Sequence, residues 1–299
     1  MRRTSSTSCR CIPDQIYAYP IMNIRTHKQR ALAGTMLAAV LLTEGLQRAV
    51  TANAAEVAQG KAPVPSGGFV PIFNGKDLAG WDGDPRLWSV LNGVIRGETT
   101  TDKPAQGNTF LIWRGGKLRD FTLKLKFRIR DGNSGVQYRS QDLGNWRVSG
   151  YQSEVSNDRA NPGIGAGFLY HERGRGELAH IGEFVVIDST GNRTVVGKVG
   201  DANALVQAGF YRNSDWNEFT ITAHGNRLVH LVNGYQTIEL IDNDPKSGAR
   251  EGILALQIHA GPPMLVEFKD LQLRVLDSGG RKFNDKGQTG WVAPPEAPK

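Results

Sequence analysis

Three segments of the sequence place polar side chains at every second position, the spacing that brings side chains onto one face of a β-strand. The segments are 135–140, 151–155 and 252–259, and the residues between the polar ones are mostly apolar. If the three strands are neighbours in one sheet, their polar side chains form a patch on its open face. That patch contains Gln137, Arg139, Gln152, Glu154, Gln257 and His259.

This patch has the chemistry expected of a site for a polyhydroxylated ligand. Amide, guanidinium and imidazole groups can pair with the hydroxyls of a sugar, and the patch holds three glutamines beside one arginine, one glutamate and one histidine. An ordinary solvated face is richer in lysine, as in the segment 122–130, where Lys and Arg alternate with apolar residues. The alternative is that the patch is only the solvated side of an antiparallel sheet.

Aromatic and acidic residues outside the patch are open to two interpretations. Asp242 and Asp244 could hold a calcium ion on a loop, or they could be solvated turn acids. The sequence has no His-x-x-x-His or Cys pair with metal-ligand spacing, so it predicts no cofactor and does not indicate a divalent metal. Four aromatic residues could stack on a sugar ring or lie in the core, namely Trp146, Trp113, Trp88 and Tyr170.

The remaining histidines are weaker candidates than His259. His224 and His230 lie on one predicted hairpin with no acidic neighbour in sequence, and we interpret them as structural. His171 lies beside Glu172 and follows the glycine-rich segment 163–167, which allows a close approach of backbone. That segment lacks the strand-turn-helix setting of a phosphate loop, which excludes a nucleotide site.

The elements that must position the patch are short strands. Alternation of apolar and polar residues is clearest in 122–130, and similar runs recur along the chain between turn residues. Gly225-Asn226 and Asn233-Gly234 are typical hairpin turns, and no stretch has persuasive helical spacing. The pattern predicts an all-β fold of two packed antiparallel sheets, a jelly-roll sandwich.

The chain is divided into four parts by its composition. Residues 1–55 contain a positively charged start, the apolar run 31–42 and small residues at 52–54, and are predicted to be a signal peptide with an upstream extension, because Met22 would begin a leader of ordinary length. The other parts are a Pro- and Gly-containing linker (56–68), the sandwich domain (69–276) and a polar C-terminal tail (277–299).

The distribution of charge and the positions of the cysteines limit which binding partners and which cell compartment are expected for the protein. The formal net charge is +7, but the seven Arg and Lys and two acids of residues 1–55 account for +5, which leaves +2 for the rest. So small a charge excludes a nucleic-acid partner. Cys9 and Cys11 both lie in the leader, so the mature chain has no disulfide. We expect a periplasmic or secreted protein without a transmembrane segment, and its oligomeric state stays open.

Several motifs, in their order along the chain, resemble those of the 3-keto-disaccharide hydrolase domain family, over roughly residues 68–276. They are Phe73-Asn74-Gly75-Lys76-Asp77-Leu78 with Gly80-Trp81, the run Asn133–Ser140, Gly150-Tyr151-Gln152-Ser153-Glu154, Asp215-Trp216-Asn217-Glu218, Asn233-Gly234 and the run Leu256–Pro263. Many members have Tyr-Glu-x-Gln where this chain has Tyr151-Gln152-Ser153-Glu154, with the amide and the carboxylate exchanged.

The resemblance implies a concanavalin A-like jelly roll whose concave sheet faces carbohydrate, and cleavage of glycosidic bonds in sugars oxidised at C3. A C3 ketone acidifies the C2 proton, so a base can form an enolate, the C1 oxygen can leave, and water can add to the enone. We assign Glu154 and His259 as base and acid, in either order, and Arg139 as electrostatic stabiliser. The predicted substrate contacts are Asn133, Gln137, Gln152, Gln257, Tyr138, Trp146 and Glu172.

Two other functions compete with this one. A non-catalytic carbohydrate-binding module or lectin-like domain is the stronger rival, because sandwich folds host binding and catalysis alike. A glycosidase with two carboxylates would need Glu172 or Asp158 beside Glu154. The Pro-rich tail suggests a third alternative, a structural role at the cell surface.

Overall fold

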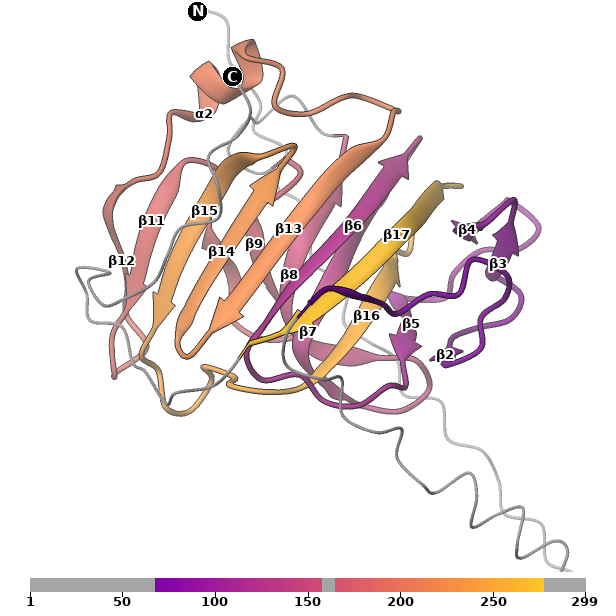
Figure 1. Ribbon diagram of the computed structural model, residues 1–299, viewed down its shortest axis with the longest axis horizontal. Helices are drawn as coiled ribbons and strands as arrows, with labels where there is room; N and C mark the ends of the chain where they lie inside the picture. The colour runs from indigo at the N-terminus through magenta and orange to yellow at the C-terminus, as the bar shows by residue number, and fades with distance from the viewer. Residues whose placement is uncertain (1–67, 158–164, 277–299) are drawn as a thin grey trace, which may run out of the picture. The chain divides into compact units, whose positions relative to one another are not determined.

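The computed structural model describes residues 68–157 and 165–276, and within them nearly all regular structure is β-strand (Figure 1). The predicted leader, most of the linker and the tail lie outside the described residues. One sheet has ten strands, in the order β12 (Arg193–Lys198), β11 (Glu183–Ile187), β15 (Tyr235–Asp242), β14 (Arg227–Val232), β13 (Asn217–His224), β6 (Phe121–Ile129), β17 (Leu265–Val275), β4 (Val94–Glu98) and β3 (Trp88–Leu91), with β1 (Val70–Pro71) paired to β17.

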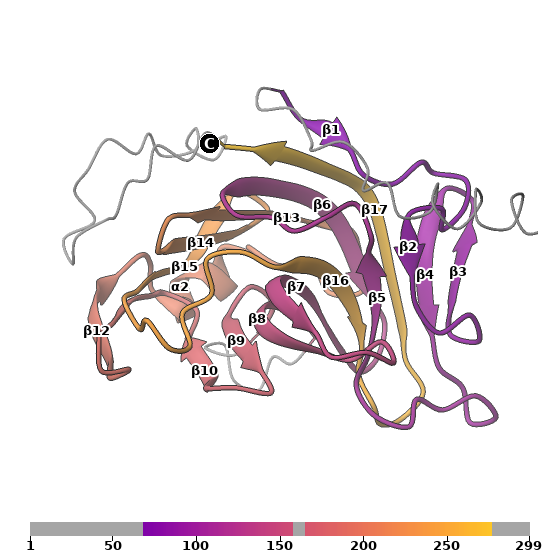
Figure 2. The ribbon, with the colours of Figure 1, turned by 90° about the horizontal axis from the view of Figure 1, so that it is seen from below.

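The second sheet has seven strands. Their order is β10 (Gly176–Ala179), β9 (Leu169–Glu172), β8 (Val148–Ser156), β7 (Asn133–Asp142), β16 (Ile253–Ile258), β5 (Thr109–Trp113) and β2 (Trp81–Asp82). The larger sheet, with β17, β6 and β13, arches over β16, β7 and β8 of the smaller one (Figure 2). The predicted two-sheet, jelly-roll-like sandwich is therefore confirmed, and the strand pairs of the described residues are antiparallel except β11 with β15.

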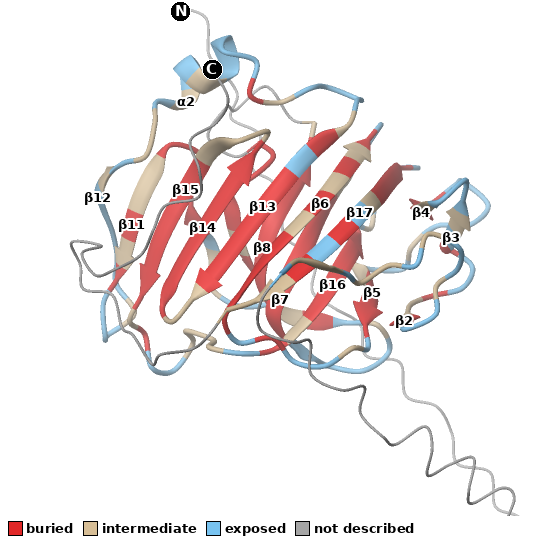
Figure 3. Cartoon of the chain, viewed as in Figure 1, coloured by how far each residue is buried: buried red, intermediate tan, exposed pale blue. Residues whose placement is uncertain are grey.

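Binary alternation explains how the sheets pack. In β6 the side chains of Leu123, Leu125, Phe127 and Ile129 are buried, and the two lysines and the arginine that alternate with them are half-buried. Apolar side chains from both sheets meet in one cluster, so the strands are largely buried and the exposed residues lie mainly in the connections (Figure 3). A period of two thus decides which residues form the core.

Polar groups also join the two sheets inside this core. Tyr138 Oη on β7 and His230 Nε2 on β14 are 2.8 Å apart, and His230 Nδ1 is 3.2 Å from the carbonyl oxygen of Gly167. The His230 Nδ1–H therefore donates to that carbonyl, and Nε2 accepts from the Tyr138 hydroxyl. Burial lowers the pKa of His230 to about 3, so the histidine is neutral, in agreement with the structural role expected for it.

Two hairpin turns lie where the sequence predicts them, and the described residues also include a short helix. The turns at Gly225-Asn226 and Asn233-Gly234 join β13 to β14 and β14 to β15. One short helix, α2 (Ala202–Gln207), lies within this β-structure, although no stretch of the sequence has persuasive helical spacing. Its Asp201 caps the backbone N–H of Ala204, and a six-residue helix without a buried face leaves no 3.6-residue pattern to detect. Among the described residues, no helix has the length and apolar character needed to cross a membrane.

Candidate functional site

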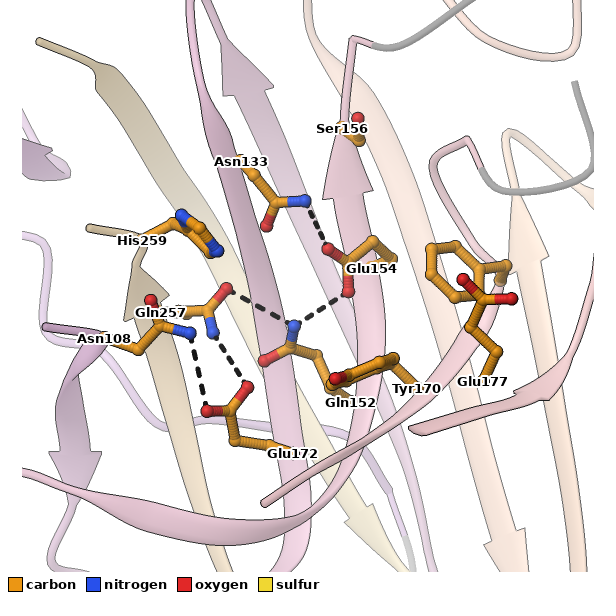
Figure 4. A pocket seen from close by; sticks show the side chains of 11 residues that line it. Asn108, Asn133, Gln152, Glu154, Ser156, Tyr170, Glu172, Glu177, Gln257 and His259 are labelled. Atoms are coloured by element: carbon orange, nitrogen blue, oxygen red, sulfur yellow. Dashed lines mark hydrogen bonds between the residues drawn. The ribbon is translucent and has the colours of Figure 1, made fainter. Parts of the chain in front are cut away.

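A polar pocket of about 310 Å³ opens on the smaller sheet, at the ends of β8, β9 and β16 (Figure 4). The prediction that the three polar segments lie side by side is confirmed, because β7 pairs with both β8 and β16. The pocket contains four of the side chains expected in the patch, Gln152, Glu154, Gln257 and His259. Asn133 and Glu172, predicted as substrate contacts, also line it.

Glu154 is the most buried carboxyl group of this pocket, with 4% of the residue exposed. Asn133 Nδ2 donates to its Oε1 at 2.5 Å, and Gln152 Nε2 donates to its Oε2 at 2.8 Å. Burial raises the pKa of Glu154 to about 7, because the two amide hydrogen bonds offset only part of the loss of solvation. A carboxyl group with this pKa exchanges a proton readily at neutral pH.

A glycine makes the space for this arrangement. Gly135 on β7 lies opposite Glu154 on β8, and a β-carbon on Gly135 would lie between 2.3 and 2.7 Å from atoms of the Gln152 carboxamide. No real β-carbon approaches so closely, so any other residue here would displace the amide that donates to Glu154. The glycine of the Asn133–Ser140 motif is thus a direct requirement of the site.

A second carboxylate, Glu172, occupies another part of the same pocket. Asn108 Nδ2 and Gln257 Nε2 each donate to one of its oxygens at 3.4 Å, and Arg173 lies 3.9 Å from it. Gln257 also accepts a hydrogen bond from Gln152 Nε2 at 3.3 Å, which links the surroundings of the two carboxylates. Figure 4 shows this continuous network of amides and carboxylates along the pocket.

His259 differs from both carboxylates because it is exposed. It follows directly after β16, and its Nδ1 lies 2.5 Å from the carbonyl oxygen of Ala260. Nδ1 therefore carries the proton that it donates, and Nε2 is the nitrogen left to exchange protons with a ligand or with water. The imidazole lines the same pocket as Glu154, as the alternation pattern indicated.

The expected position of Arg139 is wrong. Its side chain is buried away from the pocket, where it pairs with Asp120 at 2.9 Å and donates to the carbonyl oxygens of Arg119, Gly225 and Ala249. The cause is a β-bulge between Tyr138 and Gln141, at which Arg139 has a φ of 46°. A bulge reverses the faces of the residues beyond it, so strict alternation fails there.

Three further predicted contacts do not line the pocket. Tyr138 is wholly buried and bonded to His230. Trp146 lies on the β7–β8 hairpin, where its indole N–H donates to Asp82 at 2.8 Å. Gln137 does lie on the expected face, but it is wholly buried behind Gln152 and donates to Gln152 Oε1 at 2.8 Å. Tyr138 and Trp146 are therefore structural in this chain, and Gln137 is separated from a ligand by Gln152.

Other residues complete the pocket. Tyr170, one of the four aromatic candidates, lines it, whereas Trp88 and Trp113 are buried in the core. Sequence patterns gave no indication of the last four members, because each lies outside the three polar segments and outside the family-like motifs. These are Asn108, Ser156, Phe168 and Glu177.

The residues considered for calcium have other partners. Asp242 forms an ion pair with Arg175 at 2.5 Å and accepts a hydrogen bond from the Tyr151 hydroxyl, and Asp244 lies 3.5 Å from the same Arg175. Among residues 68–157 and 165–276, no group of three or more His, Cys, Asp or Glu side chains is placed to hold a metal ion. His171 accepts from Arg175 Nε at its Nδ1, and burial lowers its pKa to about 4.

Several solved structures are similar to this domain. A protein of Parabacteroides distasonis, provisionally named a glycosyl hydrolase, is 19% identical, and the likeness covers 70% of this chain and 100% of that one with a TM-score of 0.47. A carbohydrate-binding module of Bacillus subtilis is 16% identical over 65% of this chain and 95% of its own, with a TM-score of 0.42. With such scores the likenesses support neither a substrate nor a mechanism.

Sequence comparison is more informative. A 3-keto-disaccharide hydrolase of Bacteroides thetaiotaomicron is 30% identical over 98 residues, which are 30% of this chain and only 34% of that protein's length. The model of the 3-keto-alpha-glucoside-1,2-lyase-like domain matches residues 68–274, nearly the whole described domain. This match confirms the resemblance that the motifs indicated, and the chain therefore belongs to the 3-keto-alpha-glucoside-1,2-lyase-like domain family.

Proposed function

We propose that this protein cleaves the glycosidic bond of 3-keto-glycosides by removing the C2 proton, expelling the C1 oxygen and adding water to the resulting enone. Membership of the family supports the substrate class. The observation that carries the chemistry is Glu154, a buried carboxyl group at the pocket wall whose pKa is raised to about 7. A general base works best with a pKa near the pH at which it operates.

In this proposal Glu154 is the base and His259 the proton carrier for the leaving group. The Glu154 carboxylate takes the C2 proton, and the C2–H electron pair forms the enolate with the C3 carbonyl. When the enolate collapses, the C1–O bond breaks and the leaving oxygen takes a proton from His259. Water then adds its hydroxyl to C1 and a proton returns to C2, which gives the free 3-keto sugar. His259 suits this role because it is exposed and can be reprotonated by solvent.

Because Arg139 does not line the pocket, other hydrogen-bond donors must stabilise the enolate. The described residues that line the pocket include no lysine or arginine. The side chains of Asn108, Asn133 and Gln257 line the pocket, and their N–H groups are donors that could serve this purpose. Such neutral donors stabilise developing negative charge when they are held in place before the reaction, and their bonds to Glu154 and Glu172 hold them so.

The proposal is tested by the fate of the C2 proton. The purified protein is incubated with a 3-keto-glucoside in D₂O, and the product is analysed by NMR and mass spectrometry. We expect deuterium at C2 and a transient enone. Glu154→Gln is expected to lower kcat by about 10² to 10⁴, the usual contribution of a general base. Glu251→Gln, a change at an exposed carboxylate outside this pocket, is the matched control.

Other outcomes point to the competing functions. Cleavage with neither deuterium at C2 nor an enone would exclude elimination and favour hydrolysis by Glu154 with Glu172, the two carboxylates that share the pocket. Retention of the sugar without any product, unchanged in Glu154→Gln, would favour a carbohydrate-binding module.

A further inference from the structure

Gln137 is fully buried and lies outside the pocket lining, yet it is one hydrogen bond from a residue that contacts Glu154. It pairs directly with Gln152 across β7 and β8. Side chains directly opposite each other on antiparallel strands are the closest cross-strand neighbours. Gln137 is therefore placed to act on the pocket through Gln152 rather than by touching a ligand.

The hydrogen bonds from Gln137 run in one direction towards the carboxylate. Ser140 Oγ donates to Gln137 Oε1 at 2.6 Å, Gln137 Nε2 donates to Gln152 Oε1 at 2.8 Å, and Gln152 Nε2 donates to Glu154 Oε2 at 2.8 Å. Each amide has one donating and one accepting end, so the orientation of one amide determines the orientation of the next.

A reversed Gln152 amide is unfavourable in this network. Gln152 Nε2 lies between two acceptors, Glu154 Oε2 at 2.8 Å and Gln257 Oε1 at 3.3 Å. Rotation of the amide would bring its oxygen against both of them and its nitrogen against the donating nitrogen of Gln137. Buried groups left in such contacts cost their full desolvation, so the network as a whole has a single low-energy orientation.

The backbone provides space for this chain of bonds at both ends. A β-carbon on Gly135 would lie within 2.7 Å of Gln152 carboxamide atoms, and one on Gly150 would lie 2.4 Å from Ser140 Oγ. The bulge at Arg139 returns Ser140 to the side of β7 on which Gln137 lies, three residues earlier in sequence. The same bulge that removes Arg139 from the pocket thus supplies the hydroxyl that holds Gln137.

We propose that Gln137, held by Ser140, is a positioning residue that fixes the Gln152 amide with its N–H on the Glu154 carboxylate. Gln137 itself contacts neither substrate nor reacting atoms. The catalytic consequence rests on the function proposed above, whereas the effect on Glu154 does not. Without Gln137 the Gln152 Oε1 loses the donor that holds it, so the amide is less firmly fixed and its charge-assisted hydrogen bond to the ionised form of Glu154 is weakened.

The test replaces Gln137 by methionine, which has a similar length but cannot hydrogen-bond. We expect the pKa of Glu154 to rise by about one unit, because a hydrogen bond to the charged carboxylate is weakened. From a starting value of about 7, kcat at pH 7 then falls about fivefold, returns close to the wild-type value at pH 9, and KM is unchanged. Gln141→Met, at an exposed position on the same strand, is the matched control and should change neither the pKa of Glu154 nor kcat.

The decisive measurement is an NMR titration of the Glu154 carboxyl in the full chain labelled with ¹³C-glutamate, because it requires no turnover. An unchanged Glu154 titration in Gln137→Met overturns the positioning role. A raised pKa in a protein that cleaves no 3-keto-glycoside retains the positioning role and contradicts the proposed function. If Gln137→Met does not fold, Ser140→Ala gives the second test, with a smaller shift in the same direction expected and no shift overturning the proposal.

Discussion

At the scale of single residues, the buried carboxylate of Glu154 lowers the stability of the folded state and has a pKa suited to proton transfer. Its carboxyl group is almost wholly buried, and among the described residues two amide N–H groups compensate for the water that it loses on folding. A carboxylate that is incompletely compensated destabilises the folded state when it is charged. Functional sites commonly retain such groups because the raised pKa is needed for proton transfer.

This cost predicts a pH-dependent effect of Glu154→Gln on stability. The pKa of Glu154 is about 7 in the folded state against an ordinary value of 4.5. Between these values the folded state binds more protons than the unfolded one, so stability falls as pH rises. At pH 8 we expect Glu154→Gln to be more stable than the wild type by about 3 kcal/mol. Below pH 4.5 the difference should vanish.

Urea denaturation at a series of pH values measures this difference. Glu251→Gln, at an exposed carboxylate, is the control and should show no comparable trend. A Glu154→Gln variant that is less stable than the wild type at pH 8 would show that the carboxylate is well compensated, contrary to the raised pKa.

At the scale of elements, the β7 bulge separates a structural arginine from the site. Before the bulge, Gln137 lies on the face that carries the pocket, as alternation indicates. At the bulge, the Arg139 guanidinium lies against Asp120, the residue just before β6 of the opposite sheet. One extra residue in a strand therefore changes the function of a side chain from substrate contact to inter-sheet link.

Arg139→Met is therefore expected to act on stability. Removal of the guanidinium leaves Asp120, which is 5% exposed, without its ionic partner, and leaves carbonyl oxygens of three residues without their donor. Breaking a buried pair in this way costs about 3–5 kcal/mol. The control Arg114→Met breaks a surface pair with Asp82 and Asp142, and exposed pairs of this kind contribute at most about 1 kcal/mol.

Chemical denaturation and kcat, measured on the same preparations, distinguish the two roles. We expect the Arg139→Met protein to keep kcat within about threefold of the wild type at a temperature where it is folded. A loss of two orders of magnitude in kcat with normal stability would restore the stabilising role that the sequence assigned to Arg139.

At the scale of the whole molecule, the described domain carries the pocket, and the leader is predicted to direct export. The domain places one acidic and amide-rich pocket on its smaller sheet, at the ends of adjacent strands. The leader, residues 1–55, lies outside the described residues, so export stays a prediction that rests on composition. Its positive start, apolar run and small residues are typical of a signal peptide.

Export predicts a defined new N-terminus. When the chain from Met22 onwards is expressed in a Gram-negative host, we expect the protein in the periplasm, beginning at Ala55 after cleavage behind Ala52-Asn53-Ala54. Mass spectrometry of the periplasmic and cytoplasmic fractions measures this. Replacing Ala52 and Ala54 by arginine should prevent cleavage, and an uncleaved wild-type chain confined to the cytoplasm would contradict the prediction.

Much of this molecule was predictable because β-structure has a short and regular period. Alternation in segments such as 122–130 predicted the strands and their buried faces, and the Gly225-Asn226 and Asn233-Gly234 turns predicted two hairpins. The same periodicity brought Gln152, Glu154, Gln257 and His259 to one face. These are local properties, since each depends only on residues within a few positions along the chain.

Tertiary structure decided the features that depend on contacts between distant segments. The bulge that moves Arg139 cannot be recognised in the alternating sequence. It arises from the backbone conformation of one residue in the left-handed region, which shifts the register and leaves the order of polar and apolar residues as it was. Asn108 joins the site only because β5 lies beside β16. The raised pKa of Glu154 and the directed chain from Ser140 through Gln137 likewise arise from burial and from neighbours across strands, which no local pattern encodes.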